Sequence, residues 1–184
     1  MPESTARWQR VQSEVLADLK LFRARFDWMQ NPRNGITERM IVLESPDAAN
    51  VVATTPDQQM LFVRQYRFGT STEILELPGG LVDPGEDHAQ AAPRELREET
   101  GYSGGQWAHL GSIPSNPVFM TNFIHHYLAE NVTLTHALSL DTGEDLKVET
   151  LPIAQVYQRW RTGWFQHPHT VNALLLFFAR QEFF

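Results

Sequence analysis

The chain has 184 residues, 42% of them hydrophobic and 11% aromatic, which is enough for one domain with a real core. Its formal net charge of −7 and its scattered arginines disfavour long RNA or DNA as a partner, because nucleic acid needs a basic face. The absence of cysteine excludes disulfides, thiolate metal sites and cysteine nucleophiles. The sequence has no apolar run of membrane-spanning length, and the opening MPESTARWQRVQSEV lacks a signal-peptide core, so we expect a cytoplasmic protein without a membrane partner.

The N-terminal part of the chain divides into two patterns. Trp8, Val11, Val15 and Leu19 fall at helical spacing, which predicts a first helix. From residue 21 on, apolar and polar side chains alternate as in a strand, and the turn NPRNG leads into a second run, ERMIVLE. We therefore expect an N-terminal extension over residues 1–45 with a β-hairpin at 21–45, ahead of a main domain at 46–184.

The main domain contains short β-patterned runs interrupted by a few helical ones. The predicted strands are 50–55, 60–66, 72–78, 106–113, 122–129 and 145–151. The predicted helices lie within 87–101, 152–163 and 171–184. Strands and helices without strict alternation indicate an α+β fold, either α+β proper or a sandwich built on a mixed sheet.

The stretch RELREETG crowds five charges into six residues and ends on a glycine. In a helix Glu95, Glu98 and Glu99 share one face, where three carboxylates repel one another unless something neutralises them. Arg94 can pair with Glu98 four residues on, which leaves a negative patch suited to a hard cation such as Mg²⁺. Gly101 is a natural left-handed stop for the helix. The alternative for this stretch alone is a solvated helix face.

The spacing of the residues around this stretch decides between a metal-binding patch and a solvated helix face. The pattern G-x5-E-x7-R-E-U-x-E-E-x-G-U, where U is an aliphatic or aromatic residue, is the Nudix box, and the sequence resembles the Nudix hydrolases at every fixed position. The matching residues are Gly80, Glu86, Arg94, Glu95, Glu98, Glu99 and Gly101. The resemblance implies an α/β/α sandwich around a mixed sheet and the hydrolysis of a nucleoside diphosphate linked to another moiety.

The resemblance also implies roles for the box residues. Glu95 and Glu99 would be the principal ligands of Mg²⁺ or Mn²⁺, with two or three ions per site. Glu98 would assist, directly or through water, and the carbonyl of Gly79 would complete a shell. Arg94 would orient the glutamates, so that it and Glu98 count among the catalytic residues.

The remaining box positions bear on architecture. Glu86 and Gly101 would be structural. Pro93 departs from the usual pattern, so the helix is expected either to begin near Ala91 or to bend there.

Residues outside the box narrow the resemblance to ADP-ribose pyrophosphatases and related nucleoside-diphosphate-sugar hydrolases. The run VRQYRFGTSTEILELPGG is similar to the segment before the box in that group, which implies that Arg67 and Glu76 bind substrate. Pro117 stands where a proline marks the ADP-ribose group. The resemblance further implies a homodimer through the N-terminal hairpin, where Phe22, Phe26 or Trp28 would stack on a base; the alternative is that these aromatic residues fill a core face.

The resemblance implies that the hydrolytic base lies in the loop SLDTGEDLKV, which contains Asp141, Glu144 and Asp145. Glu144 matches the group best, as base or as a further metal ligand. Thr142 stands where the group has another glutamate, and the alternative is an acidic turn at Gly143.

Histidines are not expected to bind metal. His125 and His126 are adjacent on a strand and so face opposite sides, while Pro168 and Thr170 resemble the start and the cap of the last helix.

Two other functions stay open from the sequence. One is hydrolysis of another nucleotide, such as a non-standard nucleoside triphosphate or a dinucleotide. The other is a ligand sensor that has kept the fold and lost catalysis, although such sensors tend to lose box glutamates.

Overall fold

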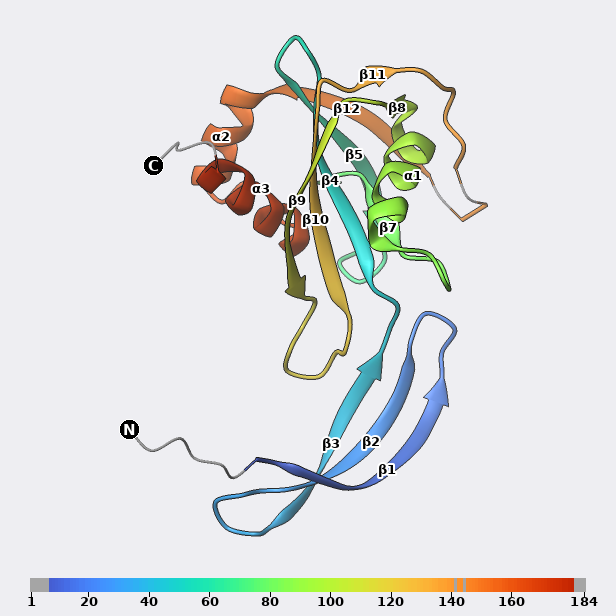
Figure 1. Cartoon of the computed structure of the whole chain (residues 1–184), viewed down its shortest axis with the longest axis vertical. Helices are drawn as coiled ribbons and strands as arrows, with labels where there is room; N and C mark the ends of the chain where they lie inside the picture. Colours follow the sequence, from blue (N-terminus) through green and yellow to red (C-terminus); the bar gives the residue numbers. More distant parts are fainter. Residues whose placement is uncertain (1–6, 141, 144, 181–184) are drawn as a thin grey trace. The chain divides into compact units, whose positions relative to one another are not determined.

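The computed structural model describes residues 7–140, 142–143 and 145–180. Its contacts divide the chain into two compact units (Figure 1). The first unit consists of the N-terminal segment up to residue 46 together with residues 114–123. The second unit contains residues 47–113 and the chain from residue 124 onward. In the part of the chain that the structure describes, no helix is long and apolar enough to cross a membrane.

The first unit is a three-stranded antiparallel sheet in the order β1–β2–β3. Its strands are β1 (Gln9–Asp18), β2 (Arg23–Gln30) and β3 (Thr37–Glu44). The β2–β3 pair confirms the expected hairpin. Residues 114–123 join the unit through a parallel bridge between Leu43 and Met120.

The predicted N-terminal helix is wrong, because that segment forms β1. Val11, Val15 and Leu19 are four residues apart, and an interval of four is even, so it puts side chains on one face of a strand as well as of a helix. Pairing with β2 along the whole length of β1 decides in favour of the strand. Two register shifts, one of them between Val15 and Ala17, interrupt the alternation that would have revealed it.

The second unit is built on a seven-stranded mixed sheet with the path β12–β5–β4–β10–β9. Strands β6 and β7 pair off that path with β5 and β4. The β4–β10 pair is parallel, whereas β5 pairs antiparallel with β6 and β12. The strands are β4 (Ala48–Thr54), β5 (Gln59–Arg67), β6 (Thr72–Glu76), β7 (Gly79–Leu81), β9 (Gln106–Pro114), β10 (Phe123–Glu130) and β12 (Leu146–Pro152). A separate two-stranded sheet pairs β8 (Tyr102–Ser103) with β11 (Thr133–Leu134).

Helices cover both faces of this sheet, with α1 (His88–Thr100) on one side and α2 (Ile153–Arg161) and α3 (Pro168–Arg180) on the other (Figure 1). The alternation along β4 explains the two layers, since Val51 packs in the core under α1 and Val52 in the core under α2 and α3. Burying both faces makes the strands apolar on both sides. The expected α+β sandwich is confirmed.

The helix that carries the acidic stretch begins earlier than expected. The side chain of Asp87 caps its first turn by accepting from the Ala89 N–H at 2.8 Å, and His88 is the first helical residue. Because the helix already begins at His88, a start near Ala91 is wrong, and Pro93 lies inside the helix. At the other end Gly101 has φ +76° and its N–H donates to the Arg97 carbonyl, which is the left-handed stop that the sequence predicted.

Candidate metal and diphosphate site

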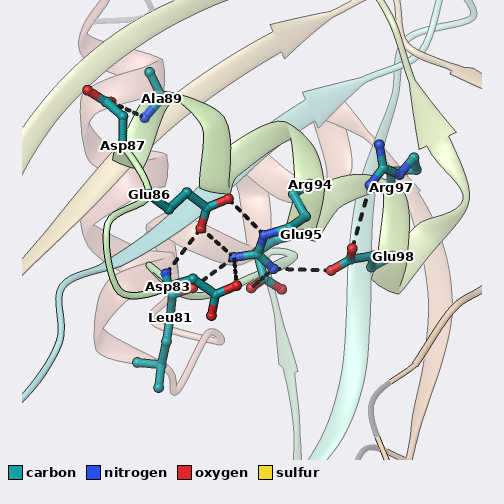
Figure 2. A network of polar contacts seen from close by, with 9 residues as sticks. All are labelled: Leu81, Asp83, Glu86, Asp87, Ala89, Arg94, Glu95, Arg97 and Glu98. Atoms are coloured by element: carbon teal, nitrogen blue, oxygen red, sulfur yellow. Dashed lines mark hydrogen bonds and ion pairs between the residues drawn. The ribbon is translucent and has the colours of Figure 1, made fainter.

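The side chain of Arg94 lies at the centre of the acidic cluster on α1 (Figure 2). Its Nε and Nη2 atoms donate to the two carboxylate oxygens of Glu86 at 2.9 and 2.8 Å. Its Nη1 atom donates to Glu95 at 2.8 Å and to Glu98 at 3.1 Å, so the expected Arg94–Glu98 pair is present. Nη2 also donates to the backbone carbonyl of Leu81 at 3.0 Å. One guanidinium therefore joins three carboxylates to the loop that precedes the helix.

The Arg94–Glu86 pair is the strongest contact in this cluster. Hydrogen bonds from Arg94 lower the pKa of Glu86 to about 2, against the opposing effect of burial, and the Asp83 N–H adds a further bond at 3.1 Å. The same bonds to Glu86 raise the pKa of Arg94, and its contacts with Glu95 and Glu98 add to the rise. Glu86 thus acts as the fixed anchor of Arg94, in agreement with its expected structural role.

Two glycines of β7, Gly79 and Gly80, let the backbone before the helix approach the remaining glutamates closely. The N–H of Gly79 donates to Glu99 at 2.8 Å, and Glu99 is 3% exposed. A Cβ on Gly80 would lie 2.7 Å from the carboxylate carbon of Glu95, and one on Gly79 would lie 2.2 Å from the Ala49 carbonyl oxygen. Only glycine fits at position 79, where backbone atoms are in the way, whereas a side chain at position 80 would displace the Glu95 carboxylate. The backbone of β7 consequently lies directly against the carboxylates of Glu95 and Glu99.

The chemistry of these donors fits a hard divalent cation. Glu95, Glu98 and Glu99 offer carboxylate oxygens, which are the ligands that Mg²⁺ prefers. The contact of Gly79 in this structure is made by its N–H, so a ligand role for its carbonyl stays a prediction. Among the described residues, no three histidine, aspartate or glutamate side chains are grouped so that they would hold one ion by themselves. Mg²⁺ usually keeps several waters and is bound by one or two carboxylates together with substrate phosphates.

A second buried carboxylate lies outside the box. Glu76, at the end of β6, is 2% exposed and accepts from Arg67 Nε at 2.6 Å and from Arg67 Nη2 at 2.8 Å. The Arg67 side chain is 42% exposed, so its guanidinium reaches the surface while one edge is held in place. The structure thus brings together the two residues that the sequence marks as substrate-binding.

Three other predicted site residues lie in the first unit. Phe22, Trp28 and Pro117 belong to the first unit, and their contact with substrate stays a prediction. Within that unit Phe26 lies edge-on to Trp28, and Arg39 lies over the Phe26 ring at 4.3 Å. The predicted base, Glu144, lies outside the described residues, as does Asp141.

The histidines pair with polar neighbours on both faces of β10. His125 contacts Asp47 at 3.1 Å and Ser112 at 2.7 Å, whereas His126 is fully buried and bonds to Asn50 at 2.7 Å. The prediction that these two rings face opposite sides is confirmed. Burial lowers the pKa of His126 to about 4, so the ring is neutral at physiological pH.

Sequence reasoning missed three contacts behind the site. The backbone carbonyl of Leu81 accepts a hydrogen bond from Arg94, and a backbone acceptor cannot be predicted from a pattern of side chains. Thr170 was expected to cap α3, but it lies inside the helix and its hydroxyl accepts from the Leu77 N–H at 3.1 Å. Asn50 interrupts the apolar run of β4, and this interruption was the available signal for a buried polar contact.

Comparisons with known proteins agree with this geometry. A model of the NUDIX domain matches residues 44–174. The methanol dehydrogenase activator of Bacillus methanolicus is 31% identical over 149 residues, which cover 80% of each chain. The ADP-ribose pyrophosphatase of Mycobacterium tuberculosis is 31% identical over 158 residues, which cover 85% of this chain and 76% of the relative.

A solved structure shares the fold of this chain. The crystal structure of an ADP compounds hydrolase superposes with a TM-score of 0.82 at 24% identity and covers 96% of both chains, which shows a shared fold. The family and the fold expected from the box are thereby confirmed. The match over residues 44–174, the complete box and the carboxylate cluster on α1 together establish that this chain is a member of the Nudix hydrolase family.

Proposed function

We propose that the protein hydrolyses the diphosphate of ADP-ribose, or of a related nucleoside diphosphate sugar, to a nucleoside monophosphate and a sugar phosphate. The observation that carries this proposal is the arrangement of Glu95, Glu98 and Glu99 around Arg94 and the glycine loop. Relatives named ADP-ribose pyrophosphatase and GDP-mannose pyrophosphatase support a nucleotide sugar as substrate. The Arg67–Glu76 pair, which the resemblance connects with substrate, supports it independently.

The reaction adds water across one phosphoanhydride bond. A water oxygen forms a new bond to one phosphorus, the bridging oxygen leaves with the other phosphate, and the water proton passes to a base. Divalent ions, when bound, neutralise the diphosphate and lower the pKa of water. Glu99 and Glu95 would hold these ions, and Arg94 keeps Glu95 and Glu98 from rotating away.

The charge of the site supports more than one ion. The positive charge of Arg94 offsets the negative charge of Glu86. The carboxylates of Glu95, Glu98 and Glu99 then leave a net charge of about −3, and a bound diphosphate adds about −2. Two divalent ions bring that total to about −1 and three bring it to about +1. We therefore propose two or three Mg²⁺ or Mn²⁺ ions per site. A rate that rises more steeply than first order in free metal would support this number, and a single-ion hyperbola would contradict it.

The test of function is a substrate panel in Mg²⁺ and in Mn²⁺ with chromatographic separation of products. It contains ADP-ribose, ADP-glucose, GDP-mannose, UDP-glucose, NADH, diadenosine polyphosphates and nucleoside triphosphates. AMP and ribose 5-phosphate formed fastest from ADP-ribose would support the proposal. Preference for a triphosphate or a dinucleotide would replace it with the second enzymatic function. Metal binding without turnover of any compound would favour a ligand sensor.

The base is assigned separately. We propose Glu144, and the variants Glu144→Gln and Glu98→Gln would divide the roles. Loss of turnover in Glu144→Gln with unchanged metal activation supports Glu144 as base. The same loss in Glu98→Gln alone would transfer the role to Glu98.

We also propose a homodimer formed through the first unit. Large apolar side chains on and beside β1 are more than half exposed, which is unusual in an isolated chain. They are Val11, Val15, Leu16, Leu19 and Leu21, with exposed fractions between 53% and 57%. A second copy of this surface would bury them, in line with the dimer that the resemblance implies. The expected cytoplasmic location stays a prediction.

A further inference from the structure

The buried carboxylate of Glu76 has a second polar neighbour besides Arg67. Nε2 of His167 lies 3.3 Å from Glu76 Oε2, the oxygen that also accepts from Arg67 Nη2 at 2.8 Å. Glu76 and His167 are 91 positions apart in the sequence, so only the fold brings them together. A buried carboxylate is costly unless its oxygens are satisfied, and here a guanidinium and an imidazole share that task.

His167 contacts Glu76 through only one of its two ring nitrogens, Nε2. The other nitrogen, Nδ1, is buried and has no hydrogen-bond partner among the described residues. Burial lowers the pKa of His167, although Glu76 opposes that effect, so the ring is neutral at physiological pH. A neutral ring has one N–H, and the proton must be on Nε2, because a bare nitrogen facing a carboxylate would be repelled. The Nε2–H of His167 therefore faces the Glu76 carboxylate in a polar contact at 3.3 Å.

The element that carries His167 is fixed in place. His167 directly precedes Pro168, the first residue of α3. The hydroxyl of Thr170, fully buried in the first turn, accepts from the Leu77 N–H, the residue that follows Glu76. The first turn of α3 is thus attached to the same segment whose carboxylate His167 contacts. A donor held by a packed helix fixes its partner better than one on a loop.

We propose that His167 is a positioning residue for substrate binding, because it holds the Glu76 carboxylate in the orientation that presents Arg67 at the surface. This inference rests on the proposed function, since it takes Arg67 to contact the nucleotide sugar. His167 would act on affinity for substrate and leave Glu95 and Glu98, which Arg94 holds, unaffected.

The experiment compares His167→Leu with His167→Gln on whichever panel substrate the wild type cleaves best. Glutamine places an amide N–H where Nε2 stands, whereas leucine keeps the volume and removes the donor. His167→Leu should raise KM about tenfold with kcat nearly unchanged, and His167→Gln should return KM to within about twofold of wild type. His109→Gln, on an exposed histidine of β9, is the matched control and should leave both constants unchanged.

Two further measurements separate positioning from general support of the fold. In an Arg67→Gln background, His167→Leu should have little additional effect on KM, because both changes remove one interaction. The NMR signal of the Arg67 Nε–H should broaden or shift in His167→Leu and recover in His167→Gln. This signal needs no turnover, so it tests the inference even if ADP-ribose proves not to be the substrate. The inference would be overturned if His167→Leu raised KM equally in the wild type and in the Arg67→Gln background. An unchanged NMR signal of the Arg67 Nε–H in His167→Leu would overturn it as well.

Discussion

Replacing Arg94 with glutamine tests whether this guanidinium holds the acidic cluster together. The pKa of Glu86 falls from 4.5 to about 2 because Arg94 bonds to its ionised form. A displacement of that size corresponds to about 3 kcal/mol, which we reduce to about 2 kcal/mol because Glu86 keeps part of its surface exposed. Glutamine also removes the counter-charge of Glu95 and Glu98, so we expect Arg94→Gln to lower the metal-free free energy of unfolding by about 2–4 kcal/mol at pH 7.

The loss should depend on pH in a defined window. Because the folded pKa of Glu86 is depressed, its contribution to stability is fully present above the unfolded value of 4.5 and is lost as the pH falls toward about 2. The difference between wild type and Arg94→Gln should therefore be constant from pH 7 to about pH 5 and shrink below that. Restoring Mg²⁺ at pH 7 should recover part of the stability, since the ions replace the missing positive charge.

Urea denaturation in EDTA, followed by tryptophan fluorescence, measures these free energies. Arg97→Gln is the matched control, because Arg97 lies on the same helix, is 46% exposed and contacts Glu98 only at 3.5 Å. Its loss should be below about 0.5 kcal/mol. Equal losses for Arg94→Gln and Arg97→Gln, or a loss from Arg94→Gln that does not change below pH 4.5, would refute the reasoning.

Three further outcomes are expected. Glu99→Gln should lower kcat by about a thousandfold with the melting temperature retained, because the amide oxygen can still accept from the Gly79 N–H; loss of folding or full activity would contradict this. Gly80→Ala should lower kcat about a hundredfold by displacing the Glu95 carboxylate, and unchanged metal activation would exclude that cause. Val15→Asp should give a 21.1 kDa monomer by light scattering if β1 forms the dimer surface, whereas a wild type that is already monomeric would exclude the dimer.

The box helix could be predicted because its signal is local. Like charges three and four residues apart need a common counter-charge, and Arg94, Glu98 and Gly101 sit where the helical repeat requires them. The seven box positions fall within 22 residues of sequence, Gly80 to Gly101, so spacing alone identifies the family. The strands of the second unit follow from runs of β-branched and aromatic residues for the same reason.

The contacts that were missed or misassigned all depend on distant partners. β1 is a strand because β2 pairs with it, although its own spacing fits a helix equally well. The carbonyl of Leu81 and the hydroxyl of Thr170 find partners 13 and 93 positions away. The hydrogen-bond partner of a backbone carbonyl, or of a threonine hydroxyl within a helix, cannot be predicted from a sequence pattern. Such contacts follow only from the fold.

Two arginines of the second unit share one arrangement and differ in one respect. Arg94 is held edge-on by Glu86, and Arg67 is held edge-on by Glu76, in each case through Nε and Nη2. The Arg94 side chain is 23% exposed and its third nitrogen donates to two box glutamates, so its charge is used inside the protein. The Arg67 side chain is 42% exposed. A guanidinium that a buried carboxylate already orients loses little entropy when it meets an anion, and the greater exposure of Arg67 is the reason for proposing that it, rather than Arg94, contacts the substrate.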